Sequence, residues 1–291
     1  KMNKKILTYT TEETGIEKFT LDLNALYENK NDRQRFEQKW DLFYKLDERN
    51  AKVFKKTKDK LIYLSESWIP TKLDNRPPVL LLFGNPAPHS VSARMYFAYE
   101  GKGREHRIWR IFRGISLLAW NNPFSVVGDT LFNNNQTPRE RFYDLDYNSP
   151  FRLAMAVYFS IPSHPSDPIW SGVGGLHRLF GEKAIGLIEK EEKKRVHQII
   201  SQFMPKDGGI IVFQKDAYNG IKKKNSPNYS LKETINGSIE ANYWFNPKIK
   251  IFGVPPTRFL QGKKAKKSLE NSINELKKYF VRIVHLDKVN K

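Results

Sequence analysis

A single run of apolar residues, Val79 to Phe83, constrains the fold of this chain more than any other feature. Such a run is typical of a strand buried on both faces, as in the middle of a parallel sheet. The following residues, Gly84-Asn85-Pro86-Ala87-Pro88, cannot continue a ladder, so the chain turns at the carboxyl end of the strand. Ligands of open α/β sheets bind at that end. Asn85 is therefore either part of a simple turn or a polar amide presented at a binding edge.

Three further apolar runs predict buried strands that alternate with helices. The expected strands cover residues 79–83, 153–159, 208–213 and 249–254. Helices are expected over residues 104–120, 183–203 and 264–280. This alternation is typical of right-handed crossovers and of a sheet with helices on both faces. We therefore expect an α/β fold in three layers, with a central four-stranded, mostly parallel sheet flanked by helices.

The first 76 residues precede this alternation and predict a helical and irregular N-terminal extension. Phe36, Trp40 and Phe43 recur at helical spacing, which is typical of a packing face. The prolines that follow Arg76 indicate a boundary. We predict an extension over residues 1–76 and an α/β domain over residues 77–291. Within that domain, the lysine-rich stretch 222–238 predicts a basic loop.

The charge of the chain restricts its partners. Fifty Lys and Arg against 31 Asp and Glu give a net charge of +19, and the isoelectric point is about 9.8. An excess of this size is typical of a protein that binds a polyanion, so DNA is the expected partner. Residues 215–291 contain 17 basic and 6 acidic residues. A second cluster comprises Arg94, Lys102, Arg104, Arg107, Arg110 and Arg113. Solvated lysine faces are the alternative interpretation.

Several classes of chemistry are not expected. The chain has no cysteine, which excludes disulfides and thiolate catalysis and fits a cytoplasmic protein. No run approaches the roughly 18 apolar residues that cross a membrane, and no basic segment carries a strong aromatic face for a membrane surface. The histidines lack the spacing of metal ligands, so we expect no metal and no cofactor. No obligate protein partner is expected.

A set of motifs in the right order resembles the uracil-DNA glycosylase superfamily, most closely its mismatch-specific uracil/thymine branch. The motifs are Gly84-Asn85-Pro86 with Ser92-Ala93, Tyr96-Phe97-Ala98 and Arg107-Ile108-Trp109-Arg110, then Lys215-Asp216-Ala217-Tyr218, then Pro255-Pro256-Thr257 with a basic helix behind it. The resemblance spans roughly residues 79–280. It implies a metal-independent DNA glycosylase that flips a pyrimidine base out of the duplex and hydrolyses its N-glycosidic bond.

The resemblance also implies roles for individual residues. Asn85 matches the amide that positions the attacking water, and Phe97 matches the ring that stacks on the flipped base, with a plain core phenylalanine as the alternative. His89 is a second catalytic candidate, either as a positive charge near the leaving base or as a surface histidine. The remaining candidates for the base pocket are Gly84, Pro86 and Ser160.

The segment after the fourth strand is expected to contact DNA. Arg258-Phe259-Leu260 suits a wedge that fills the hole left by the flipped base. Lys263, Lys264, Lys266 and Lys267 would then lie along the phosphates, beside the start of a helix. Thr257 is a further candidate for DNA contact.

Two departures from the family leave the function open. Where the second motif of much of the superfamily begins with His or Asn, this chain has Val254 or Pro255. The second strand ends in Tyr158-Phe159-Ser160, without the Asn that reads uracil in several branches. We therefore expect a uracil-like or bulkier modified pyrimidine as the substrate, in base excision repair or in defence against modified foreign DNA. The alternative is a catalytically weak or inactive module that binds modified or damaged DNA.

Overall fold

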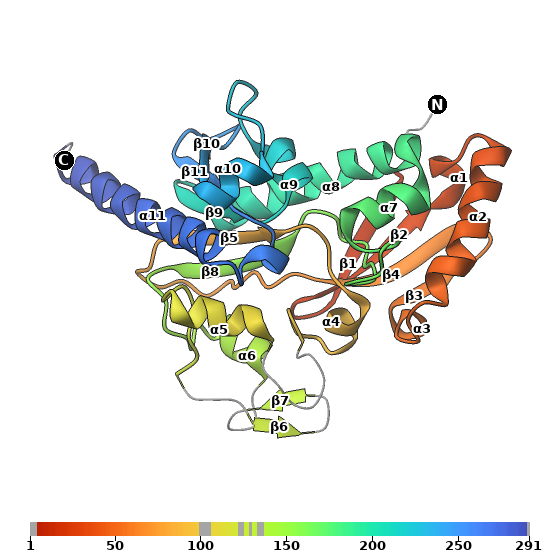
Figure 1. Ribbon diagram of the computed structural model, residues 1–291, viewed down its shortest axis with the longest axis horizontal. Coiled ribbons are helices and arrows are strands. Elements are labelled where there is room, and N and C mark those ends of the chain that lie inside the picture. The colour runs from red at the N-terminus through yellow and green to blue at the C-terminus, as the bar shows by residue number, and fades with distance from the viewer. Residues whose placement is uncertain (1–4, 99–105, 122–124, 128–129, 133–136, 290–291) are drawn as a thin grey trace. The chain divides into compact units, whose positions relative to one another are not determined.

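The computed structural model describes residues 5–98, 106–121, 125–127, 130–132 and 137–289 (Figure 1). The chain forms two compact units, each assembled from three segments. The first unit comprises Lys1–Trp68, Gly84–Ala98 and Val157–Gln198, and the second comprises Ile69–Phe83, Tyr99–Ala156 and Ile199–Lys291. Lys102 and Arg104 of the predicted basic cluster lie outside the described residues. The boundary between residues 76 and 77 remains a prediction.

A five-stranded sheet forms the centre of the second unit (Figure 1). Its strands, in spatial order, are β10 (Ile239–Asn242), β11 (Ile249–Gly253), β9 (Gly208–Val212), β5 (Pro78–Phe83) and β8 (Arg152–Val157). Strands β11, β9 and β5 pair in parallel, and β10 is an antiparallel edge strand. The prediction of an α/β fold with a mostly parallel sheet is confirmed, whereas the number of strands is five rather than the predicted four.

The unpredicted strand, β10, directly follows the stretch whose composition predicts a basic loop. That stretch contains the helix α10 (Leu231–Asn236), which begins where Ser230 Oγ accepts a hydrogen bond from Glu233 N. In β10 the buried Ile239 and Ala241 alternate with the exposed Glu240. Four residues with two apolar side chains carry too little periodic signal to predict a strand. It is the pairing with β11 that makes this segment a strand.

The strand order reverses beside β5. From β5 the chain passes to β8 on one side and then to β9 on the other. In open α/β sheets, ligands bind outside the carboxyl ends of the strands at such a reversal. β5 ends at Phe83, whose ring stacks on Phe213 beyond β9 with centroids 4.8 Å apart. The next two residues of the chain are Gly84 and Asn85, so the candidate amide directly follows the strand at the reversal.

The second unit also contains helices. They are α5 (Arg107–Gly114), α6 (Pro138–Tyr143), α9 (Lys215–Ile221), α10 and α11 (Lys263–Val289), with the short 3-10 helix η1 (Thr257–Phe259) and the two-stranded pair β6 (Ser125–Val127) and β7 (Thr130–Phe132). Of these helices, α9 contacts β9 and β11. Gly209 of β9 lets α11 pack close to the sheet. A side chain at this position would overlap Leu276 of α11, since a Cβ on Gly209 would lie 2.5 Å from Leu276 Cδ2. Helix α5 is shorter than the predicted 104–120, because Ser116 has a φ of 55° that a right-handed helix cannot accommodate.

An antiparallel sheet and several helices make up the first unit. Its strands are β1 (Leu7–Glu13), β2 (Ile16–Asp22), β4 (Lys60–Glu66) and β3 (Phe54–Lys56), in that spatial order. Its helices are α1 (Leu23–Leu26), α2 (Lys30–Tyr44), α3 (Asn50–Val53), α4 (Pro88–Ser92), α7 (Gly172–Phe180) and most of α8 (Glu182–Phe203). The predicted aromatic helix is α2. The description of residues 1–76 as helical and irregular missed the sheet. The strand β1 buries little more than Leu7, whereas β2 and β4 alternate buried and less buried residues as strands do.

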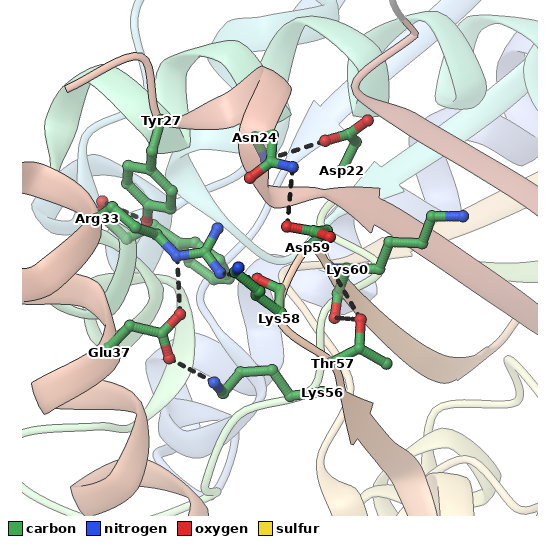
Figure 2. A network of polar contacts seen from close by, with 11 residues as sticks. Asp22, Asn24, Tyr27, Arg33, Glu37, Lys56, Thr57, Lys58, Asp59 and Lys60 are labelled. Carbon is green, nitrogen blue, oxygen red and sulfur yellow. Dashed lines mark hydrogen bonds and ion pairs between the residues drawn. The ribbon is translucent and has the colours of Figure 1, made fainter. Parts of the chain in front are cut away.

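A network of charged side chains connects α2 to the β3–β4 hairpin (Figure 2). Glu37 accepts a hydrogen bond from Arg33 Nε at 2.7 Å and a second one from Lys56. Burial alone would raise the pKa of Glu37, but these two cations hold it below its ordinary value. Asn24 Nδ2 donates to Asp59 at 2.9 Å on the turn of the same hairpin. These charges are engaged in holding the fold of the first unit.

Candidate functional site

Three acceptors hold the side chain of Asn85 within the first unit. Its Nδ2 donates to Ser163 Oγ at 2.8 Å and to the carbonyls of Pro86 and Ile161 at 3.2 Å each. Because carbonyl oxygens only accept, the atom that faces them is the amide nitrogen. The orientation of the amide is thereby fixed, and among the described residues none donates a hydrogen bond to its Oδ1. A half-buried Asn85 therefore presents one acceptor in a set direction.

The segment of residues 159–163 forms the support for this amide. Phe159 N donates to the carbonyl of Gly84 at 2.8 Å, and Ser163 N donates to the carbonyl of Pro86 at 3.0 Å. Ser163 Oγ accepts from Asn85 and donates to the carbonyl of Gly172 at 3.2 Å. The position of the amide is thus linked through one hydroxyl to the first residue of α7.

Helix α7 lies against the chain that precedes it. A Cβ on Gly175 would lie 2.3 Å from the main-chain carbonyl carbon and oxygen of Trp170, whereas a Cβ on Gly174 would meet nothing within 4 Å. The turn before the helix is fixed by Asp167, whose Oδ1 accepts from Trp170 N at 2.7 Å. Only glycine at position 175 allows the first turn of α7 to pack this close to the main chain of Trp170.

Phe97 adopts a strained backbone conformation. Its φ is 50°, in the left-handed region that bulky residues rarely occupy, and its side chain is half-buried. Such outliers cluster at functional sites. The preceding Tyr96 is buried, and its hydroxyl donates to the carbonyl of Glu66 at 2.9 Å. Tyr96 therefore anchors the turn that holds Phe97.

The other residues of the predicted catalytic turn lie in the same unit. Gly84 and Pro86 contribute the two carbonyls that pair with the support segment, and Pro86 is buried. His89 is half-buried in α4, three residues beyond Pro86. Gly84 and Pro86 therefore flank Asn85 in the turn, and His89 lies on the helix that follows it.

Ser160 belongs to a buried polar network. Its hydroxyl contacts Glu192 and lies 2.8 Å from the hydroxyl of Tyr63, and its main-chain N donates to Glu192 at 2.6 Å. Arg195 Nε binds the same carboxylate at 2.7 Å. Burial alone would lower the pKa of Arg195, but Glu192 and Glu17 raise it above its ordinary value. Since its hydroxyl is engaged and fully buried, Ser160 offers no donor to a base. Apart from the three-residue spacing on α8, nothing in the sequence pattern indicated this network.

The predicted wedge lies in the second unit and is only partly exposed. Arg258 is exposed, and its guanidinium lies 4.9 Å from the ring centroid of Phe259. Thr257 and Phe259 are half-buried in η1. Leu260 is fully buried, which corrects its prediction as part of the wedge, because an apolar side chain at this position packs in the core. Arg258 and Phe259 remain the accessible part of the segment.

Two basic clusters that are far apart in the sequence meet in the second unit. Lys266, near the start of α11, lies beside Gly114 at the end of α5. A Cβ on Gly114 would be 3.7 Å from Lys266 Nζ. We name this surface the α5–α11 basic face, and its members are Arg110, Arg113, Lys263, Lys264 and Lys266. Lys267 pairs with Glu270 at 3.5 Å, but none of the three lysines of the face forms an ion pair with a described carboxylate. Concentrated positive charge of this kind attracts a polyanion.

Neither a metal centre nor a membrane span is present in the described part of the chain. No three histidine or carboxylate side chains among the described residues come together as metal ligands. No helix within the described ranges combines the length and apolar character that crossing a bilayer requires. No protein-family model matches the chain, and no curated protein matches it either.

Proposed function

We propose that the protein is a DNA glycosylase that hydrolyses the N-glycosidic bond of a flipped-out, modified pyrimidine. The observation that carries the proposal is the Asn85 amide. Its nitrogen is held by three acceptors, its Oδ1 has no donor among the described residues, and it directly follows the strand at which the sheet order reverses. In open α/β sheets, ligands bind where the chain leaves a strand at such a reversal.

The chemistry requires a positioned water more than a strong base. As the bond between C1′ of the sugar and the base lengthens, positive charge develops on the sugar and negative charge on the base. Asn85 Oδ1 accepts a hydrogen bond from a water molecule. This bond orients the water so that a lone pair of the water oxygen points at C1′. The water oxygen then bonds to C1′ and its proton passes to solvent. The base leaves with the bonding electron pair and takes up a proton, which gives a free base and an abasic site.

Two other residues of the first unit support the reaction. The half-buried ring of Phe97 would stack on the flipped base, which offsets part of the few kcal/mol that unstacking costs. His89, on the helix that follows the Asn85 turn, would place a positive charge near the departing base. In the second unit, the α5–α11 basic face would bind the phosphates.

Two positions favour a modified base over plain uracil. The hydroxyl of Ser160 is engaged by Glu192 and Tyr63. Val254 is fully buried, and its N–H donates to the carbonyl of Val212 at 2.9 Å. Neither residue supplies a donor to a carbonyl of uracil. A hydroxymethylated or glycosylated cytosine, met in repair or in foreign DNA, is therefore the proposed substrate class.

The same two positions favour a second candidate function, a module that binds modified or damaged DNA without cutting it. In that case the Asn85 amide serves only to shape the turn. Both candidates require DNA binding, but only the glycosylase releases a base. Base release therefore separates them.

The experiment uses labelled duplexes that each carry one uracil, one mismatched thymine, one hydroxymethylated cytosine or one glycosylated cytosine. Alkali cleaves the strand at any abasic site, and mass spectrometry identifies the released base. We expect cleavage of a duplex with a modified pyrimidine by the native protein. Efficient release of uracil alone would refute the proposed substrate class. Binding without cleavage of any duplex would establish the second candidate.

A further inference from the structure

The tip of the β10–β11 hairpin exposes two adjacent aromatic side chains. Trp244 is 51% exposed and Phe245 is 63% exposed. Their ring centroids are 4.4 Å apart, with an angle of 36° between the ring planes. Exposed apolar surface that is contiguous marks an interaction site more often than scattered single residues do. The exposed parts of these two rings are therefore a candidate binding surface.

The turn that carries the two rings is held in place by hydrogen bonds. Tyr243 is buried, and its N donates to the carbonyl of Ile249 at 2.8 Å. Asn246 connects the turn in two directions, since its Oδ1 accepts from Lys248 N at 2.9 Å and its Nδ2 donates to the carbonyl of Lys206 at 2.8 Å. The rings are thus presented on a fixed turn, which reduces the entropy cost of binding.

Exposed lysines lie beside this turn. Lys248 belongs to it, and the main chain of Lys206 is bonded to Asn246. Lys223 N donates to the carbonyl of Asn242 at 3.0 Å, which places Lys223 and the neighbouring Lys224 beside the end of β10. None of these four lysines forms an ion pair with a carboxylate in the described ranges, whereas Lys250 of the same hairpin pairs with Glu240 at 2.7 Å.

We propose that this aromatic tip, defined as Trp244 and Phe245 with the four unpaired lysines, binds unpaired bases of single-stranded DNA. Stacking on aromatic rings together with phosphate contacts to lysines is how proteins bind single strands without reading their sequence. The choice of DNA as the polymer rests on the proposed function. A lipid surface fits less well, because membrane affinity grows with the apolar area inserted and the tip exposes only two rings.

Fluorescence anisotropy of a labelled oligothymidylate of about 16 nucleotides, the upper site size of a single-strand binding fold, tests the proposal. We expect the Trp244→Ala/Phe245→Ala variant to bind it at least about tenfold more weakly than the native protein. Lys206→Ala/Lys248→Ala should lower the slope of log K against log salt by about 1.4. The matched control is Val281→Ala, which removes an apolar side chain that is 70% exposed on α11 and should change nothing.

Three results would overturn the proposal. One is native affinity for the oligothymidylate in the double aromatic variant. Another is loss of binding to phosphatidylserine vesicles in that variant while the oligonucleotide binds normally. The third is tighter binding of the matching oligouridylate. Failure of the proposed function is distinguishable, since Asn85→Ala should end base release but keep oligothymidylate binding. The aromatic variant should still release the base from a fully paired duplex.

Discussion

At the scale of single residues, three acceptors orient the one amide on which the proposed reaction depends. Ser163 Oγ forms the shortest of the three hydrogen bonds, and it alone connects Asn85 to the start of α7. A neutral hydrogen bond contributes about 1 kcal/mol, or roughly a fivefold change in a population. The hydroxyl therefore controls how much of the time Oδ1 points in the productive direction.

Ser163→Ala should lower kcat for base release by roughly five- to tenfold and leave the Kd for DNA unchanged, because the variant disturbs orientation and not contact. Single-turnover rates and a binding titration measure the two quantities. Ser166→Ala, an exposed serine of the same loop, is the matched control. An unchanged kcat in Ser163→Ala would show that the amide is held by the carbonyls alone.

His197 on α8 makes the stability of the first unit depend on pH. Burial, aided by the charge of Lys193, lowers the pKa of His197 from 6.5 to about 4. The folded state thus keeps the imidazole neutral while the unfolded chain takes up a proton. Stability is therefore full above the unfolded value of 6.5 and decreases as the pH falls toward about 4.

His197→Gln should lose less stability than the native protein between about pH 7 and about pH 5, because a neutral amide takes up no proton on unfolding. Urea unfolding at the two pH values measures the difference. Equal decreases in the two proteins would show that His197 is not the titrating group.

Some residues of the site could be predicted from the sequence, and others could not for a physical reason. Asn85 could be found because a polar residue after a buried strand is a local signal. The hydrogen bonding of Ser160 to Glu192 could not be found, since it joins residues 32 positions apart in the chain. The burial of Leu260 likewise could not be predicted, because an apolar residue can lie in the core or at a binding surface and only the tertiary packing decides between them.

At the scale of elements, the start of α7 offers two neighbouring glycines with opposite surroundings. A Cβ on Gly174 would meet nothing within 4 Å, and a Cβ on Gly175 would overlap the main chain of Trp170 at 2.3 Å. Since main-chain atoms cannot move aside as the end of a side chain can, the overlap must displace α7 or the loop before it.

Gly174→Ala should stabilise the protein by about 0.5–1 kcal/mol, because alanine loses less backbone entropy in a helix. Gly175→Ala should destabilise it by about 1–3 kcal/mol and slow base release, since α7 supports Ser163. Chemical unfolding and the base-release assay measure both effects. Equal stabilities of the two variants would contradict the close packing of α7.

The predicted elements are those with strong local patterns. The buried runs 79–83, 153–159, 208–213 and 249–254 became β5, β8, β9 and β11. Helix α2 followed from its aromatic spacing. The strand β10 and the sheet of the first unit were missed. The strands β3 and β10 are short and β1 is largely exposed, so they carry little local signal. The strands β2 and β4 do alternate buried and less buried residues, and this signal was overlooked when residues 1–76 were described as helical and irregular.

At the scale of the whole molecule, the net charge of +19 favours the binding of a polyanion. Part of this charge is concentrated on the α5–α11 basic face, where residues of α5 and α11 come together. The excess charge was evident in the composition, but this meeting of two clusters was not, since about 150 residues separate them in the chain.

Lys263→Ala/Lys264→Ala should weaken binding to all duplexes alike and lower the salt slope by about 1.8, or about 0.9 for each phosphate that is no longer neutralised. Fluorescence anisotropy over a range of salt concentrations measures the slope. Lys190→Ala, an exposed lysine of the first unit, is the control. A native slope in the double variant would remove this face from the DNA contact.

The decisive quantity for the proposed chemistry is the single-turnover rate at which Asn85→Ala releases a modified pyrimidine from duplex DNA. If Oδ1 of Asn85 positions the water, the rate should fall by about 10²- to 10⁴-fold while the Kd for the duplex stays unchanged. Release at the native rate by Asn85→Ala would show that this amide does not position the water.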